Sequence, residues 1–336
     1  MILVTGGTGL VGAHLLYKLS LTESKIRAIY RSEIKIEKTR HVFHYFTEDV
    51  DTLFNKIEWI EADILDVPKL EEAFQGITRV YHAAALVSFD PNDYYKLRKT
   101  NIEGTANIVN LCLSNQIEKL CYVSSIATLG KEENGIITEM TEWNPNDDNS
   151  VYAITKYGAE MEVWRGTQEG LDVVIVNPGI ILGAGFWKLG SGALFRKIHK
   201  GLAYYTTGSL GYVDVNDVVN GMLKLMNSDI RNERYIMVAD NWSFKDFSIM
   251  VANKLIVNPP KKEVKPWQLQ LVWRLDWLNY FFKSKYRKFT KQMAKSVLNN
   301  SEFSSEKLKS DLKFEFKSIE DSISETCELF IKDLKS

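Results

Sequence analysis

The chain begins MILVTGGTGLVGAHLL at residues 1–16, where three glycines follow an apolar run at equal intervals. The stretch GTGLVG at residues 7–12 matches G-x-G-x-x-G, a pattern that ordinary loops also meet by chance. Here it joins a strand-like run to a helical pattern. Small residues let the backbone approach a pyrophosphate, and a helix N-terminus offers N–H groups to it. We therefore predict a dinucleotide-binding turn rather than a purely structural one. Its expected cofactor contacts are Gly6, Gly9, Leu10, Val11 and Gly12.

Short apolar or β-branched runs alternate with helical patterns along most of the chain. This alternation predicts an α/β fold, a doubly wound parallel sheet of Rossmann type with helices on both faces. We place the dinucleotide-binding domain at 1–176, with a returning segment at about 210–240. A smaller, interleaved C-terminal substrate lobe would take 177–209 and 241–336. One strand near Tyr235 is expected to rejoin the sheet, and the end of the chain is expected to form a terminal helix.

Composition narrows the class of protein. The net charge of -1 gives no electrostatic reason to expect nucleic acid as a partner. Three cysteines without metal-ligand spacing are expected to be reduced thiols in a cytoplasmic protein. The first strand starts at Ile2, so we expect no secretory peptide. The apolar stretch 267–282 is shorter than a membrane span and contains two charges, which predicts no transmembrane segment; a surface-binding helix remains an alternative there.

The second strand-like run, IRAIYRS, carries the cofactor prediction. An acidic residue usually ends this strand and holds the ribose hydroxyls, whereas Arg31 stands near that place here. An arginine favours a 2'-phosphate, so NADP(H) is preferred over NAD(H). The alternative is that Arg31 is a solvated charge at a strand end.

A tyrosine and a lysine four residues apart lie on one face of a helix. The spacing occurs twice, at Tyr95 and Lys99 and again at Tyr152 and Lys156, so spacing alone decides nothing. The second pair follows a strand that ends at Ser125, at the carboxyl edge where parallel sheets bind ligands. The first pair has no comparable hydroxyl partner and fits a solvated helix face.

These motifs together resemble the extended short-chain dehydrogenases/reductases, the NAD(P)-dependent epimerase/dehydratase superfamily. TGGTGLVG, EADIL, HAAA, NIEGTAN, YVSSIATLG, YAITK, NPGIILG and YVDVNDV occur in the family's order over about residues 1–218. YRSE after the second strand is similar to dihydroflavonol-reductase-like and 3β-hydroxysteroid-dehydrogenase-like members. The resemblance implies Ser125, Tyr152 and Lys156 as catalytic residues, with Ser125 chosen over Ser124 by the register of SSIATLG.

The resemblance and strand-end positions suggest further contacts. For the cofactor these are Asp63 and Ile64 beside the adenine, Ala83, Ala84 and Ala85 along its backbone, Lys156, and Pro178 and Ile181 at the nicotinamide. Asp63 could instead cap the next turn. Substrate contacts are expected from Val87, Phe89, Ser125, Tyr152, Phe186 and Trp187. We expect structural roles for His82 and Asn101, and no metal site.

The function predicted is an NADP(H)-dependent oxidoreductase that interconverts a carbonyl and a secondary alcohol on a small, fairly apolar molecule. A phenol with a pKa near 10 is a poor base at neutral pH, and a nearby lysine favours its phenolate. A nucleotide-sugar epimerase or dehydratase is the second interpretation, and a cofactor-sensing protein without turnover is the third. Helices around 92–114 and 151–167 are expected to support a homodimer, as in other family members.

Overall fold

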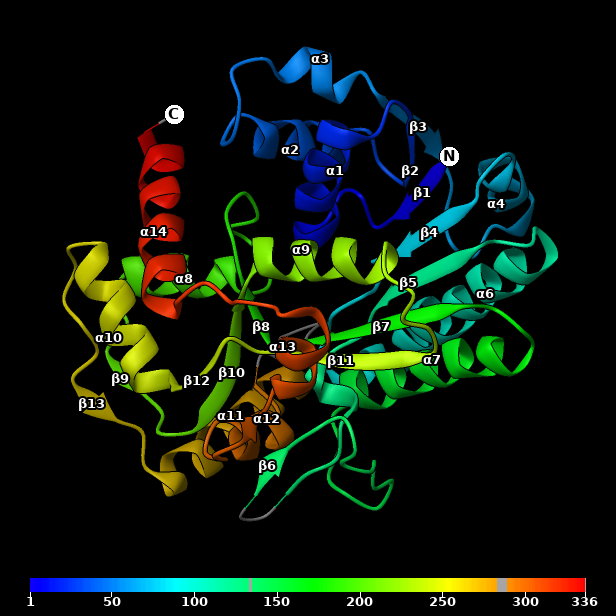
Figure 1. Cartoon of the computed structure of the whole chain (residues 1–336). Coiled ribbons are helices and arrows are strands. Elements are labelled where there is room, and N and C mark those ends of the chain that lie inside the picture. Colours follow the sequence, from blue (N-terminus) through cyan, green and yellow to red (C-terminus); the bar gives the residue numbers. More distant parts are fainter. Residues whose placement is uncertain (133–134, 283–288, 336) are drawn as a thin grey trace.

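A parallel β-sheet forms the centre of the protein in the computed structural model (Figure 1). Within residues 1–132, 135–282 and 289–335, which the structure describes, it has seven strands in the order β11-β7-β5-β4-β1-β2-β3. Their bounds are β1 Ile2–Thr5, β2 Ile26–Tyr30, β3 Ile57–Glu61, β4 Arg79–His82, β5 Lys119–Val123, β7 Val173–Pro178 and β11 Glu233–Met237.

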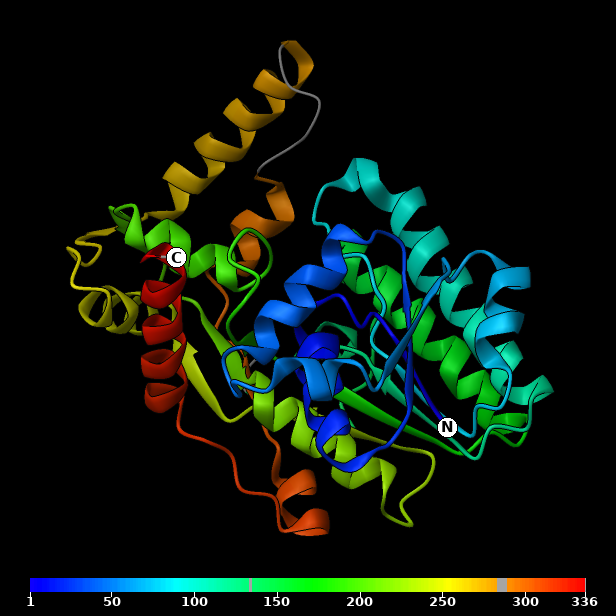
Figure 2. The same ribbon diagram turned by 90° about the horizontal axis from the view of Figure 1, so that it is seen from above.

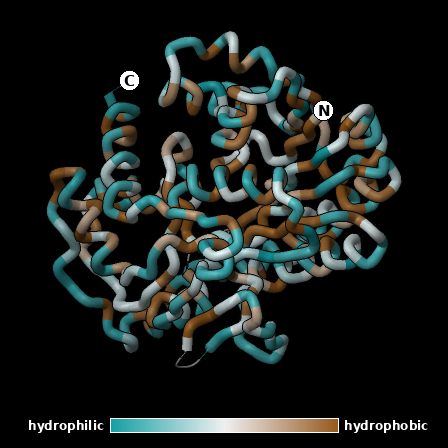
Figure 3. Tube along the Cα trace, in the orientation of Figure 1, coloured by the Kyte–Doolittle hydropathy of each residue, from teal (hydrophilic) through white to brown (hydrophobic). Residues whose placement is uncertain are grey.

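The strands are buried because helices cover both faces of the sheet. Every residue of β1 and β7 is buried, as their continuous apolar runs predict for a parallel sheet. Hydrophobic residues follow these central strands in Figure 3. The helices on one face are α1 Leu10–Thr22, α2 Ile34–Phe43, α3 Val50–Phe54 and α9 Val215–Met226; on the other are α4 Val67–Phe74, α6 Gly104–Ser114 and α7 Val151–Gln168. The predicted doubly wound fold is confirmed.

A second lobe lies beside the sheet and has its own apolar core. Its sheet joins β8 and β10 in parallel and β10 and β12 in antiparallel pairing. These elements are β8 Ile180–Leu182, β10 Ser209–Asp214, β12 Asp240–Ser243, α8 Gly192–His199, α10 Phe244–Lys254, α11 Pro266–Phe282, α12 Lys291–Ser296 and α14 Ile319–Lys335. Between α12 and α14, α13 Glu306–Leu312 packs instead against β11 of the central sheet.

Two details differ from the sequence predictions. Of the segment 210–240, α9 and β11 join the central domain, whereas β10 pairs in the smaller sheet. The C-terminal stretch forms two helices, because Lys313 adopts a left-handed backbone conformation (φ 47°) that ends α13.

Short elements complete the chain. They are η1 Pro91–Asp93, α5 Tyr94–Leu97, the π-helical η2 Arg98–Glu103, η3 Ile126–Thr128, β6 Ile136–Ile137, β9 Tyr204–Tyr205, β13 Lys262–Glu263 and β14 Glu302–Phe303.

The strand order reverses direction between β1 and β4, which are neighbours in the sheet. Ligands of doubly wound proteins bind at such a switch point, outside the carboxyl ends of the strands. The glycine turn follows β1, the alanine run follows β4 and Ser125 follows β5. The topology therefore brings three predicted site segments to one edge.

Candidate active site

The glycine turn is tight enough that side chains would not fit. Gly6 has φ +72°, and a Cβ there would lie 2.6 Å from the backbone carbonyl carbon of Ala83. A Cβ on Gly12 would lie 2.1 Å from the carbonyl oxygen of Gly6. Gly9 caps α1 without a side-chain hydrogen bond to the first turn of the helix. This backbone cradle at a helix N-terminus fits a pyrophosphate.

The alanine run lies against the glycine turn. The N–H of Ala83 donates to the carbonyl oxygen of Thr5 (3.2 Å), and the N–H of Ala84 donates to Thr5 Oγ1 (3.3 Å). These bonds hold the end of β4 beside the end of β1. Ala85 is exposed at the start of the following loop. The small side chains leave the backbone of both strand ends accessible from the cradle.

His82 and Asn101 have the structural roles expected of them. The two ring nitrogens of His82 are bonded to Thr5 Oγ1 (2.6 Å) and Thr105 Oγ1 (3.0 Å). Burial lowers the pKa of His82 to about 3, so the ring is neutral. Asn101 Nδ2 donates to the carbonyl oxygen of Leu86, and its Oδ1 accepts from the N–H of the same residue. Asn101 thereby holds the loop that follows β4.

Arg31 and Asp63 lie together at the ends of β2 and β3. Arg31 Nη1 is 3.4 Å from Asp63 Oδ2, and the two side chains are 53% and 36% exposed. An exposed pair of this kind is weak, so the guanidinium can exchange partners at little cost. Asp63 Oδ1 also accepts from the N–H of Leu65, which is the capping role considered as an alternative. Ile64 is buried in the core.

Ser125 and Tyr152 meet at the carboxyl end of β5. Ser125 caps the short helix η3, and its Oγ accepts from the N–H of Ala127 (3.2 Å). Tyr152 stands in the first turn of α7, which Ser150 caps through the N–H of Ala153. Burial raises the pKa of the Tyr152 phenol, and its hydrogen bond with Ser125 acts in the opposite direction.

Lys156 lies one turn further along α7 and is only 1% exposed. Its Nζ donates to Tyr122 Oη (2.7 Å) and to the carbonyl oxygen of Val123 (2.9 Å), both on β5. Burial lowers the pKa of Lys156 to about 7, and the charge of Glu160 opposes this shift. The side chain of Lys156 therefore reaches the central sheet, and its described hydrogen-bond partners are on β5.

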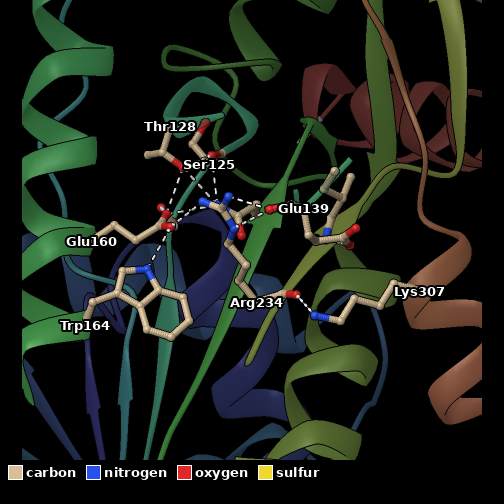
Figure 4. Close-up of polar contacts among 10 residues, drawn as sticks. Ser125, Thr128, Glu139, Glu160, Trp164, Arg234 and Lys307 are labelled. Carbon is tan, nitrogen blue, oxygen red and sulfur yellow. Dashed lines mark hydrogen bonds and ion pairs between the residues drawn. The ribbon is translucent and has the colours of Figure 1, made fainter. Parts of the chain in front are cut away.

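A buried network surrounds Glu160, one turn beyond Lys156 (Figure 4). Its Oε2 accepts from Ser124 Oγ (2.5 Å) and Thr128 Oγ1 (2.8 Å). Arg234, on β11, places its Nη1 3.1 Å from Glu160 Oε1. The hydroxyl of Ser124 is thus used in the hydrogen bond to the Glu160 carboxylate. Ser125 is the serine that contacts Tyr152.

Asn177 and Glu139 extend this network on either side. Asn177 Nδ2 donates to Glu160 Oε2 (3.0 Å) and to the carbonyl oxygen of Ser125 (3.2 Å). Arg234 Nε donates to the carbonyl oxygen of Glu139 (3.0 Å). Through these hydrogen bonds and the ion pair, the network links α7, β7 and β11 to the segment that carries Ser125.

The remaining predicted contacts fall into two groups. Val87 and Phe89 are exposed on the loop after β4, and the Phe89 ring lies 5.5 Å from that of Tyr152. Trp187 instead packs 5.0 Å from Phe330 and donates from Nε1 to Asp333 Oδ2 (2.6 Å), both on α14. In the structure Phe89 thus lies next to Tyr152, whereas Trp187 packs against and hydrogen-bonds to the C-terminal helix α14.

Three other predicted contacts lie along the chain from β7 to the start of α8. Pro178 ends β7 and is buried, while Ile181 lies in β8 and packs against the core. Phe186 is half-buried between β8 and α8.

The sequence analysis did not identify Tyr122, Glu160, Arg234 or Asn177. One feature of the sequence could have indicated Glu160, namely an acidic residue four positions after Lys156. The same pattern is common on solvated helices, so it does not distinguish a buried residue. Arg234 is far from Glu160 in the sequence, and nothing local marks it.

Comparison with known proteins defines the class. Residues 2–238 match the model of the NAD dependent epimerase/dehydratase family. A putative dihydroflavonol 4-reductase of Synechocystis sp. is 28% identical, over 79% of this chain and 75% of the relative. Sterol demethylase protein B of Methylococcus capsulatus is 29% identical, over 71% of this chain and 70% of the relative. The crystal structure of gox2253 superimposes with a TM-score of 0.82 at 26% identity, covering 99% of this chain and 98% of that one.

The chain therefore belongs to the NAD dependent epimerase/dehydratase family. It is an NAD(P)-dependent enzyme of the extended short-chain dehydrogenase/reductase type. Over the described residues, no group of three His, Cys, Asp or Glu side chains could hold a metal ion. None of the described helices is long and apolar enough to cross a bilayer.

Proposed function

We propose that this protein is an NADP(H)-dependent reductase that interconverts a carbonyl and a secondary alcohol on a small, fairly apolar molecule. The observation that carries the proposal is the contact between Ser125 and Tyr152 at the carboxyl edge of the sheet, with Lys156 buried one turn away. A dinucleotide held at the glycine turn would lie along the same edge.

In the reductive direction each residue has a defined task. A dinucleotide held at the glycine turn would supply, from its nicotinamide, the hydride for the carbonyl carbon. Tyr152 Oη donates its proton to the carbonyl oxygen, and Ser125 Oγ donates a hydrogen bond to that oxygen. The phenolate that remains is stabilised by Lys156 in its protonated form, which a pKa of about 7 provides at and below neutral pH, since an opposite charge favours the ionised phenol. In the oxidative direction the same phenolate accepts the alcohol proton.

Several observations support an apolar substrate. Val87 and Phe89, on the loop after β4, are 58% and 43% exposed, and the Phe89 ring lies 5.5 Å from that of Tyr152. Such exposed apolar side chains favour contact with an apolar or aromatic ligand. The name of one relative, a putative dihydroflavonol 4-reductase, agrees with an aromatic ketone as substrate.

A screen of aldehydes, ketones and nucleotide sugars, read by oxidation of NADPH, tests the proposal. We expect turnover with apolar ketones or aldehydes and none with the Tyr152→Phe protein as blank. Conversion of a nucleotide sugar without net consumption of NADPH would instead establish an epimerase or dehydratase and refute the reductase.

The preference for NADP(H) rests on Arg31. Its guanidinium is exposed and only weakly paired with Asp63, so it is available for a 2'-phosphate. Arg31→Ala should weaken NADPH binding about tenfold, the loss expected for a charged hydrogen bond, and leave NADH binding nearly unchanged. Titration by protein fluorescence measures both constants, with Lys69→Ala as an exposed control. Tighter binding of NADH than NADPH by the unmodified protein would contradict the preference.

Dimerisation through the helices at 92–114 and 151–167 remains a prediction. Analytical sedimentation tests this prediction, and a protein that is monomeric at all concentrations would contradict the predicted dimer.

A further inference from the structure

Helix α11 stands out from the body of the molecule (Figure 2). It packs mainly against α12. On its packed side Leu269 is 5% exposed, and Trp273 and Tyr280 are half-buried. This side accounts for the helix's contact with the protein.

The opposite side of α11 is also apolar. Five large side chains, spaced three or four residues apart, share one face of the helix and are between 47% and 71% exposed. We call them the α11 stripe: Trp267, Leu271, Leu275, Leu278 and Phe282. A continuous exposed apolar face on a soluble protein marks an interaction site.

The charges around the stripe indicate what covers it. Among the described residues from 261 to 291, five are basic and two are acidic, although the whole chain has a net charge of -1. The basic residues are exposed: Lys261, Lys262, Lys265, Arg274 and Lys291. Of the two acidic ones, Asp276 is half-buried and accepts from the N–H of Phe289. The segment that carries the apolar face therefore has an excess of exposed positive charge, with Glu263 as its one exposed acidic residue among those described.

A second copy of this chain is a poor partner for such a face. A two-fold interface through the stripe would bring together two copies of a segment with excess positive charge, which like-charge repulsion opposes. An anionic bilayer surface satisfies both features, because Trp, Phe and Leu enter the boundary between headgroups and acyl chains while Lys and Arg contact the anionic headgroups.

We propose that the α11 stripe docks this protein on the surface of an anionic lipid bilayer. The helix lies in the plane of the interface and does not cross the membrane, consistent with its 17 residues and its charged Arg274 and Asp276. The proposal is independent of the substrate and of catalysis.

Flotation of the full-length protein with phosphatidylcholine vesicles, with and without phosphatidylglycerol, tests this docking. We expect binding to the anionic vesicles that weakens as salt is raised. The triple variant Leu271→Gln, Leu275→Gln, Leu278→Gln should bind at least about tenfold more weakly, because it removes exposed apolar area and retains good helix formers. Lys261→Gln, Lys262→Gln, Lys265→Gln should also lose more than about tenfold, since each lysine near such a surface contributes about fivefold.

The matched control replaces three exposed apolar residues elsewhere, Leu21→Gln, Ile34→Gln and Leu189→Gln, and should bind as the unmodified protein does. Circular dichroism and NADPH binding confirm that each variant is folded. The proposal is overturned if the unmodified protein does not float with anionic vesicles, or if the α11 variant floats as well as the control. Self-association that the α11 variant abolishes would assign the face to a second copy and overturn it equally.

Discussion

Two segments of this chain carry the same pattern, Y-x-x-x-K-x-x-x-E, in opposite surroundings. One is Tyr95, Lys99 and Glu103, and the other is Tyr152, Lys156 and Glu160. In the first, Tyr95 is 82% exposed, and the side chain of Glu103, itself 44% exposed, pairs with Arg98. The first segment is thus a solvated helical surface.

In the second segment the same residue types are enclosed. Lys156 and Glu160 are buried and bonded to β5 and β11, and Tyr152 meets Ser125. The comparison shows that spacing places these side chains on one helix face, whereas burial in the second segment raises the pKa of Tyr152 and lowers that of Lys156. Three pairs of variants test this difference, and each makes the same change in both segments.

The largest difference is expected between Tyr152→Phe and Tyr95→Phe. Loss of the Tyr152 hydroxyl should reduce kcat about a thousandfold, the range for a removed general acid, with NADPH affinity kept. Tyr95→Phe should leave kcat unchanged because its ring is in solvent. Steady-state rates on a substrate from the screen measure both. Equal activity of the two variants would remove the proposed role of Tyr152.

A smaller difference is expected for stability between Glu160→Gln and Glu103→Gln. Removing the Glu160 charge leaves Arg234 and Lys156 without their buried anion, which should lower the free energy of unfolding by about 3 kcal/mol. Glu103→Gln breaks only an exposed pair and should change it by less than about 0.5 kcal/mol. Urea unfolding at neutral pH measures both values. Similar losses would show that the buried network around Glu160 contributes no more to stability than the exposed pair of Glu103 and Arg98.

The smallest difference concerns pH. The pKa of Lys156 is lowered to about 7 in the folded chain from 10.5, so between about pH 7 and 10 the unfolded chain binds a proton that the folded chain does not. Stability from this group therefore rises with pH across that window, by at most about 1.4 kcal/mol per pH unit.

Lys156→Met should remove this rise, whereas Lys99→Met should keep the unmodified protein's profile. Urea midpoints at several pH values measure the profiles. A Lys156→Met profile parallel to that of the unmodified protein would contradict the lowered pKa.

Much of the central fold was predictable because its signals are local. The parallel sheet follows from continuous apolar runs, and the glycine turn follows from a motif directly after the first strand. The break at Lys313 and the pairing of β10 outside the central sheet were not predictable, since a backbone conformation at one lysine and a choice of strand partner leave no periodic signal.

The candidate site was predictable in part. Ser125, Tyr152 and Lys156 could be chosen from position in the chain, and the structure places them at one edge, while their catalytic roles remain proposals. The contacts of Trp187 with α14 were not predictable, because its partners there are distant in sequence, and its contact with the substrate stays a prediction.

The sequence by itself determined the alternation of strands and helices, the turn that three glycines allow, and two helix faces with the same tyrosine, lysine and glutamate. These are consequences of local backbone geometry and side-chain spacing. Only the tertiary structure decided how the second face is enclosed, because the segment after β5 supplies Ser125 and β11 supplies Arg234 from distant parts of the chain. Removal from water is what changes the proton affinity of Lys156, and it requires the packed sheet.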